Sequence, residues 1–197
     1  MPLDISFTLG IIAGVISALA YLIYFRSILK GESKPSRVTW WIWTFMGAIL
    51  AASYYASGAR DTIWAPIVEF VGPLLTAILA IKYGEGGIES KTDVFCFVGG
   101  VLSILIWVIF DAPIVTLVMN LLIDGFAIIP TIKKSYERPD GENVWAWLGT
   151  AIGDGVNIFA SEKLVFAILV YPIWMFLVDM VVIGAILRGT DGKNYRS

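Results

Sequence analysis

Seven long apolar stretches, separated by short charged breaks, constrain the fold of this chain more than any other feature. They cover residues 5–25, 38–57, 62–83, 94–110, 112–132, 143–160 and 164–187. A bilayer core requires about 17–25 apolar residues per helix, so each stretch is long enough to cross a membrane. Hydrophobic residues make up 58% of the chain and charged residues only 15%, which leaves too few polar side chains for a soluble surface. The sequence predicts an all-α integral membrane protein with seven transmembrane helices.

Lys and Arg residues are distributed unequally between the two ends of these helices. If the N-terminus lies outside, twelve of the 14 basic residues fall in inner loops or the C-terminal tail, and only Arg60 and Lys163 fall outside. Cytoplasmic loops carry such an excess of Lys and Arg. The first residues, MPLDISF, lack the basic region of a signal peptide. We therefore expect a retained first helix, an outer N-terminus and a cytoplasmic C-terminus, in a bacterial-type plasma (inner) membrane.

A shift of 104 positions aligns the first three stretches with the last three. The aligned pairs are Pro35 with Pro139, Trp41 with Trp145, Trp43 with Trp147, and Ser53 with Asn157. A single intervening helix gives both halves the same direction, so the sequence predicts two parallel three-helix-bundle repeats joined by a linker helix. The predicted divisions are a first repeat over 1–84, a linker helix over 85–111, a second repeat over 112–190 and a cytoplasmic tail over 191–197.

This arrangement resembles the SWEET and PQ-loop (MtN3-like) transporter superfamily, because parallel repeats about an axis along the membrane normal are typical of SWEETs. The place of the family's Pro-Gln signature holds Arg26-Ser27 in the first repeat and Pro130-Thr131 in the second. The PnuC-type vitamin carriers, which are also seven-helix and Trp-rich, are a related alternative. The resemblance implies a substrate held between the second and third helices of each repeat, with Ser53 and Asn157 at the matching second-helix positions.

Four carboxylic acids, Glu69, Asp124, Asp154 and Asp179, lie within the apolar stretches, and no basic residue lies at the same depth. An ionisable group at the centre of a span costs about 2.5–3.5 kcal/mol or more and usually faces the protein interior or a water-filled cavity. These acids are therefore expected to be protonated, hydrated or matched to a group from outside. The sequence predicts a polar central cavity.

Helical spacing gives the other candidate residues. Trp147, Thr150, Asp154 and Asn157 are spaced three, four and three apart, so they form one stripe on a helix. The aligned stripe of the first repeat runs from Trp43 to Ser53. The predicted substrate-binding set is Trp43, Ser53, Tyr54, Glu69, Asn120, Asp124, Trp147, Asp154, Asn157 and Asp179.

Structural roles are the alternative for several of these residues. Tryptophans are common at membrane interfaces, and small or polar residues often only connect helices. Anchoring at the membrane interface is the alternative for Trp40, Trp41, Trp43, Trp145 and Trp147. Bridging between helices is the alternative for Ser53, Asn120 and Thr150. Close helix packing is the alternative for Gly47, Gly149, Gly153 and Gly155.

Four prolines lie within the apolar stretches: Pro66, Pro73, Pro130 and Pro172. A proline inside a helix removes a backbone hydrogen bond and permits a kink. These residues are predicted hinges for rocking of one repeat against the other, and a static kink that only shapes the bundle is the alternative.

These features favour a transporter of a small polar solute, similar to a sugar or a vitamin, that works by alternating access. Transport is coupled to protons if one of the acids binds and releases a proton. The alternative is a ligand-binding seven-helix receptor or sensor of the same architecture. The chain has no histidine and one cysteine, Cys96, which argues against an enzyme and against a metal or cofactor. A potassium-channel filter is absent. The expected partners are the solute, protons and the lipid bilayer, with no nucleic acid, and a homo-oligomer is left open.

Overall fold

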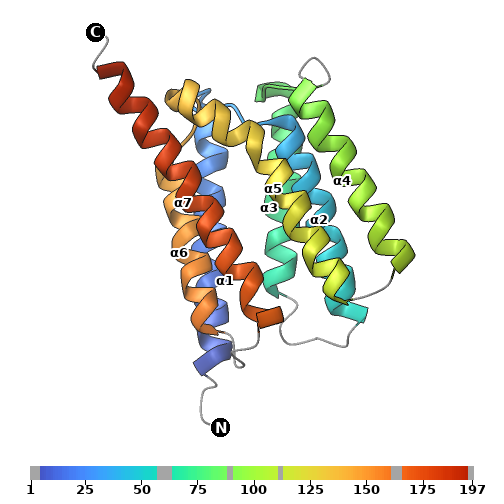
Figure 1. Ribbon diagram of the computed structural model, residues 1–197. Coiled ribbons are helices and arrows are strands. Elements are labelled where there is room, and N and C mark those ends of the chain that lie inside the picture. Colours follow the sequence, from blue (N-terminus) through green and yellow to red (C-terminus); the bar gives the residue numbers. More distant parts are fainter. Residues whose placement is uncertain (1–4, 57–63, 88–90, 111–112, 161–165, 195–197) are drawn as a thin grey trace.

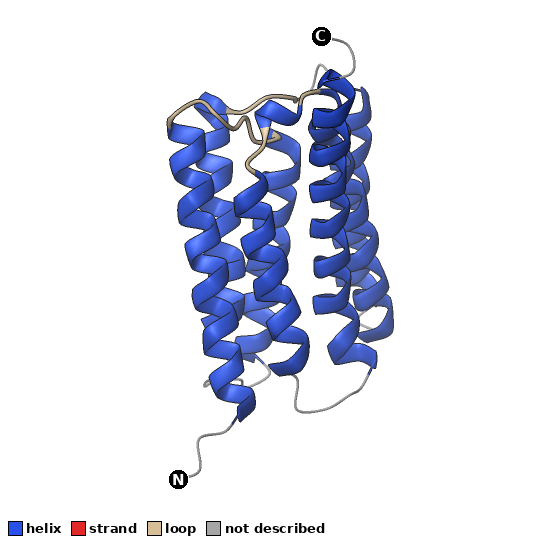
Figure 2. Cartoon of the chain, turned by 90° about the vertical axis from the view of Figure 1, so that its left-hand side faces the viewer, coloured by secondary structure: helices blue, strands red, loops and turns tan. Residues whose placement is uncertain are grey.

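The described part of the computed structural model, residues 5–56, 64–87, 91–110, 113–160 and 166–194, is helical and contains no named strand. Its seven α-helices alternate in direction, so α1 begins at one end of the bundle and α7 ends at the other (Figures 1 and 2). The helices are α1 (Ile5–Leu29), α2 (Arg37–Ala56), α3 (Trp64–Tyr83), α4 (Lys91–Phe110), α5 (Pro113–Glu137), α6 (Val144–Ala160) and α7 (Phe166–Asn194), and a 3-10 turn, η1 (Pro139–Gly141), precedes α6. Each apolar stretch of the sequence coincides with one of these helices, which confirms the predicted all-α class and the order of its elements.

The helices form two triplets with the same internal order. In the first triplet, α3 lies between α1 and α2, and in the second triplet α7 lies between α5 and α6. Across the two triplets α1 packs on α6 and α2 packs on α5, while α4 packs mainly on α5. Exchanging one triplet for the other leaves this pattern of neighbours unchanged, so the two triplets are alike in the order of their contacts.

Glycines allow close approach between neighbouring helices. A Cβ atom on Gly47 of α2 would lie 2.6 Å from the backbone oxygen of Glu69 and 2.8 Å from Cα of Phe70, both in α3. One on Gly153 would meet Ser17 of α1, and one on Gly149 would lie 2.7 Å from Cβ of Ala20. These three glycines therefore pack helices together, as predicted. Gly155 does not, because its nearest neighbour would be 3.7 Å away.

We expect Gly47→Ala to lower the free energy of unfolding by about 1–3 kcal/mol, because the added methyl group meets backbone atoms of α3 that cannot move aside independently. Gly155→Ala is the matched control: its Cβ has room, and alanine is the better helix former by up to about 1 kcal/mol. Unfolding of the purified protein in detergent measures both. Equal stability of the two variants would contradict the close approach of α2 to α3.

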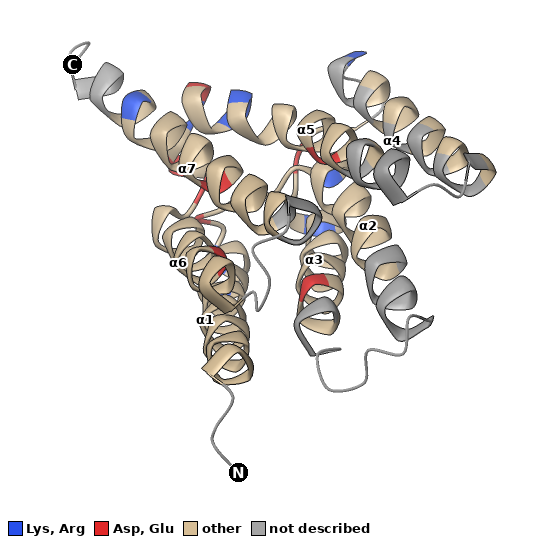
Figure 3. Ribbon diagram, turned by 60° about the horizontal axis from the view of Figure 1, so that its bottom comes forward, with Lys and Arg blue, Asp and Glu red and all other residues tan. Residues whose placement is uncertain are grey.

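The described Lys and Arg residues lie at one end of the bundle, which we call the basic end; it is the end where α1 finishes and α2 begins (Figure 3). They are Arg26, Lys30, Lys34, Arg37, Lys82, Lys91, Lys133, Lys134, Arg138 and Arg188. Arg60, Lys163 and Arg196 and the side chain of Lys193 lie outside the described part of the structure.

Large apolar side chains cover much of the outer surface of the bundle. Leu22 of α1, Ile109 of α4 and Leu177 of α7 are among the exposed ones. Two of the described helical segments, Ile5–Leu29 and Pro172–Thr190, are long and apolar enough to cross a membrane by length and composition.

Three of the four predicted hinge prolines lie inside helices: Pro73 in α3, Pro130 in α5 and Pro172 in α7. Pro66 lies in the first described turn of α3, and its side chain is outside the described residues. Their role as hinges stays a prediction. α7 continues through residues 191–194, which the sequence analysis assigned to the tail. The assignment was wrong because the apolar stretch, from which the end of the helix was predicted, ends before the helix does.

Candidate functional site

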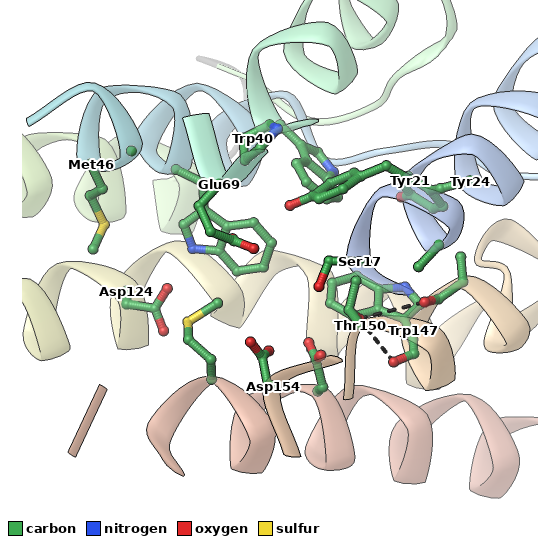
Figure 4. Close-up of a pocket in the computed structure, with 17 residues that line it drawn as sticks. Ser17, Tyr21, Tyr24, Trp40, Met46, Glu69, Asp124, Trp147, Thr150 and Asp154 are labelled. Carbon is green, nitrogen blue, oxygen red and sulfur yellow. Dashed lines mark hydrogen bonds between the residues drawn. The ribbon is translucent and has the colours of Figure 1, made fainter. Parts of the chain in front are cut away.

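A cavity lies between the two triplets, and α1, α2, α3, α5, α6 and α7 all contribute to its walls (Figure 4). Its empty volume is about 700 Å³, a figure that includes the open solvent at its mouth. The lining residues are Ser17, Ala20, Tyr21, Tyr24, Trp40, Trp43, Met46, Gly47, Glu69, Pro73, Asp124, Ala146, Trp147, Thr150, Asp154, Met175 and Asp179.

All four carboxylic acids predicted from the sequence line this cavity, each from a different helix. Figure 4 shows Glu69, Asp124 and Asp154 on the walls of the same space. Asp124 is buried and accepts a hydrogen bond from the indole N–H of Trp174 in α7. Asp179 is only 2% exposed, and its Oδ2 has no hydrogen-bond partner among the described residues.

None of the ion pairs between described residues includes these acids. A buried carboxyl group without a cationic neighbour is costly unless it is protonated or meets a partner. The cavity is therefore a place where a proton, water or a ligand completes the interactions of the protein.

The orientation of α6 places the predicted stripe on the cavity wall. Asn143 caps the helix, since its side-chain oxygen accepts hydrogen bonds from the backbone N–H groups of Trp145 and Ala146, both at 3.1 Å. From this start the three-four spacing brings Trp147, Thr150 and Asp154 to the cavity.

Five aromatic residues form a layer on the side of the acids that faces the basic end; we call Tyr21, Tyr24, Trp40, Trp43 and Trp147 the aromatic layer. Their rings are buried and pack with centroids 5.0 Å apart for Trp40 and Trp43 and 6.2 Å apart for Trp43 and Trp147. The aligned residues of the two halves, Trp43 and Trp147, thus meet at the centre of the molecule. The five packed rings therefore form the wall of the cavity on the side of the basic end.

The interface-anchor alternative is wrong for Trp40, Trp43 and Trp147, because their rings lie inside the protein. Trp145, which is 69% exposed, fits that alternative. The physical reason is helical periodicity: residues two positions apart point to nearly opposite sides of a helix, so one of the pair faces in and the other out.

A buried polar network connects the halves next to the aromatic layer; we call Tyr24, Lys134, Glu142 and Trp147 the latch. Glu142 Oε2 accepts hydrogen bonds from the Tyr24 hydroxyl at 2.8 Å and from Trp147 Nε1 at 3.0 Å. Its Oε1 pairs with Lys134 Nζ, and the two side chains are 0% and 6% exposed. Lys134 Nζ also donates to the backbone oxygen of Lys34. The latch ties α1 and the loop after it to α5 and α6.

A second cross-connection lies at the surface of the basic end. Arg138, which follows α5, makes a two-point contact with Glu85, which follows α3, at 2.8 and 2.9 Å. The backbone N–H of Lys34 donates to the backbone oxygen of Gly141 at 2.8 Å. The contact of Lys34 joins the first half to the second, and that of Arg138 joins the second half to the segment after α3, so the latch is not the sole connection at the basic end among the described residues.

A second cavity adjoins the first toward the opposite end of the bundle; its empty volume, open solvent at its mouth included, is about 430 Å³. The two share Ser17, Glu69, Asp154 and Met175 among their lining residues. Asn157 lines this second cavity. The hollow region thus runs from the aromatic layer toward the end at which α1 begins.

The structure brings most of the predicted site residues together. Trp43, Glu69, Asp124, Trp147, Asp154 and Asp179 line the first cavity, and Asn157 lines the second. The side chains of Ser53, Tyr54 and Asn120 lie outside the described part of the structure.

Sequence reasoning missed the contribution of α1. Ser17, Tyr21 and Tyr24 all line the first cavity. Their spacing of four and three places them on one face of the helix. A stripe of hydroxyl groups in an otherwise apolar stretch was the signal that could have found them. The latch residues Lys134 and Glu142 were also missed, because both were counted only as loop charges.

Comparisons with known proteins give no further guide to this site: no family model, no curated protein and no solved structure matches the chain. The resemblance to the SWEET and PQ-loop superfamily therefore stays a prediction.

Proposed function

We propose that the protein is a membrane-embedded transporter of a small polar solute that works by alternating access, with the first cavity as its binding site. The observation that carries this proposal is a cavity that lies between two triplets with the same pattern of helix contacts. The aromatic layer and the latch lie on one side of this cavity, and both triplets contribute residues to them. Alternating access needs a central site that is closed to one side at a time, and rocking of two repeats around a fixed site achieves this.

The surface of the bundle supports a membrane location. In the 18-residue apolar window of each of the two segments long enough to span a bilayer, only 22% and 33% of the residues are buried within the protein. A core helix of a soluble protein is mostly buried, whereas these helices leave large apolar side chains exposed over wide areas. The basic end supports a cytoplasmic location for that side and an outer location for the N-terminus.

The arrangement of the triplets supports a parallel repeat of the SWEET and PQ-loop type. In this proposal α4 is the linker helix, and Pro73, Pro130 and Pro172 are the positions at which helices bend as the halves rock. The four acids bind the solute or a coupling proton, because a carboxyl group that gains and loses a proton links its charge to the occupancy of the site.

Uptake into vesicles tests the proposal. The purified protein is reconstituted into liposomes, and uptake of labelled sugars, vitamins, amino acids and amines is followed with and without a pH gradient. We expect at least one solute to enter faster than in protein-free vesicles, and Asp154→Asn to reduce its initial rate about tenfold or more, since the carboxyl group that binds the solute or the proton is removed.

Glu137→Gln is the matched control for this experiment, because Glu137 is an exposed acid at the basic end. It should leave uptake unchanged. Absence of uptake for every solute would contradict the transporter proposal. A ligand that stabilises the protein against heat but never enters the vesicles would instead favour the receptor or sensor.

A further inference from the structure

We propose that the two interfaces between the triplets differ in function: α1 and α6 stay in contact throughout transport, and the first cavity opens toward the basic end when α2 separates from α5. This inference rests on the proposed function, because it takes alternating access as given. It specifies which helices separate. Symmetric rocking of one triplet against the other would instead separate both pairs of helices.

The two interfaces occupy equivalent places in the fold. Exchange of one triplet for the other converts the contact of α1 with α6 into the contact of α5 with α2 (Figure 1). Among the described residues, however, α1 and α6 pack much more extensively than α2 and α5 do. The two interfaces therefore differ although their positions match, and a difference of this kind gives them unequal resistance to separation.

Small residues bring the backbones of α1 and α6 into close contact. A Cβ atom on Gly149 of α6 would lie 2.7 Å from Cβ of Ala20 in α1. One on Gly153 would meet Oγ of Ser17 and lie 3.3 Å from the backbone oxygen of Ala13. Small residues four apart permit such close packing of helices in membranes, where many dispersion contacts together hold the helices. Separation would lose these contacts at once, so we expect this interface to persist.

The α2–α5 interface lacks an equivalent approach of backbones among the described residues. The shift of 104 positions aligns Gly149 with Phe45 of α2, and the ring of Phe45 is 51% exposed. The glycine of α2, Gly47, approaches α3, and the glycine of α5, Gly125, faces α7. The face of α2 that corresponds to the α1-facing side of α6 is therefore only partly covered at this level.

Hydrogen bonds near the basic end connect α2 and its preceding loop to α5. The hydroxyl group of Thr39 donates to the backbone oxygen of Ala127 at 2.5 Å and lies 3.0 Å from Oγ1 of Thr131. Lys134 of α5 donates to the backbone oxygen of Lys34, in the loop that leads into α2. Water can replace hydrogen bonds of this kind, so their net contribution is modest. This interface is therefore suited to repeated opening and closing.

A disulfide across the α2–α5 interface tests whether this interface must open. Thr39→Cys/Thr131→Cys is made in a Cys96→Ser background, because hydroxyl groups 3.0 Å apart place the two Cβ atoms within reach of a disulfide. We expect oxidation to lower the initial rate of uptake about tenfold or more, and reduction to restore it, since the bond holds the protein in one of two conformations. Thr39→Cys alone is the matched control, and oxidation should not change its rate. Undiminished uptake by the oxidised double variant would overturn the inference.

Distances between nitroxide spin labels test whether the α1–α6 interface persists. The pair Leu29→Cys/Trp145→Cys reports on α1 and α6, and both side chains are exposed. The pair Phe45→Cys/Lys133→Cys reports on α2 and α5, and these side chains are exposed too. Both pairs are made in a Cys96→Ser background and measured in lipid nanodiscs with and without Glu142→Gln, which removes a charge of the buried ion pair. We expect Glu142→Gln to add a longer component between α2 and α5 and to leave the α1–α6 distribution unchanged.

Lengthening of both distances, of the α1–α6 distance alone, or of neither would each overturn the inference. This measurement does not depend on uptake, and it decides the inference if the double cysteine variant does not fold. Uptake together with a change between α1 and α6 would keep the transporter and overturn the inference. A change between α2 and α5 alone, without uptake of any solute, would contradict the transporter and keep the assignment of the helices that separate.

Discussion

Lys134→Met is expected to lower the free energy of unfolding by about 3–5 kcal/mol, the usual cost of removing one partner from a buried ion pair. The reason lies in Glu142, whose side chain is fully buried. In the variant this carboxylate keeps its hydrogen bonds from Tyr24 and Trp147 but loses its only ion-pair partner among the described residues. A buried negative charge without a cation then opposes folding.

A double-mutant cycle separates the pair from its surroundings. Glu142→Gln removes the charge and keeps a side-chain oxygen for Tyr24 and Trp147, so the double variant Lys134→Met/Glu142→Gln should recover most of the lost stability. Lys133→Met is the matched control, because Lys133 is exposed and 4.0 Å from the exposed Glu137; it should change stability by no more than about 0.5 kcal/mol. Unfolding in detergent by denaturant provides the measurement. If Lys134→Met were no more harmful than Lys133→Met, the buried pair would have no structural role.

The fold was predictable because an apolar stretch long enough to cross a bilayer is compatible with few secondary structures other than an α-helix. The stretch 94–110 ends with α4 at the same residue, and the other helices follow their stretches closely. The misfits occur where a helix continues past its apolar segment, as α5 does to Glu137 and α7 does to Asn194. Backbone hydrogen bonding decides these ends, and charged side chains at a helix terminus are compatible with it.

The acids of the site were predictable for a different reason. A carboxyl group within an apolar stretch is costly wherever it faces lipid, so the sequence alone indicates that it faces inward. Tyr21 and Tyr24 give a weaker signal, the stripe of hydroxyl groups that they form with Ser17, because a single aromatic residue is equally suited to lipid, to the interior and to the interface. Glu142 lies in a charged break, and its burial depends on how closely α1 and α5 approach, which the sequence does not specify.

The two ends of the hollow region are expected to differ in their access to water. Thr150 lines the first cavity, so a cysteine placed there, in a Cys96→Ser background, reports access to the site. In sealed vesicles a membrane-impermeant thiol reagent should label Thr150→Cys on the order of a hundredfold faster from the end at which α1 begins than from the basic end. The aromatic layer and the latch block the basic end, and two hydrogen bonds to a charged group contribute about 3 kcal/mol or more to keeping it closed.

Loosening the latch should shift this balance. Glu142→Gln replaces two charge-assisted hydrogen bonds by weaker neutral ones, and a change of about 1.4 kcal/mol alters the ratio of two conformations tenfold. We therefore expect the variant to narrow the difference in labelling rate to within about tenfold, by raising the rate from the basic end. Glu137→Cys, at an exposed position of the basic end, should be labelled quickly from that side in every background, which verifies the sidedness of the vesicles. Equal labelling rates of Thr150→Cys from both sides, in the protein with an intact latch, would contradict the prediction that the basic end is closed. A ratio unchanged by Glu142→Gln would show that the aromatic rings alone close it.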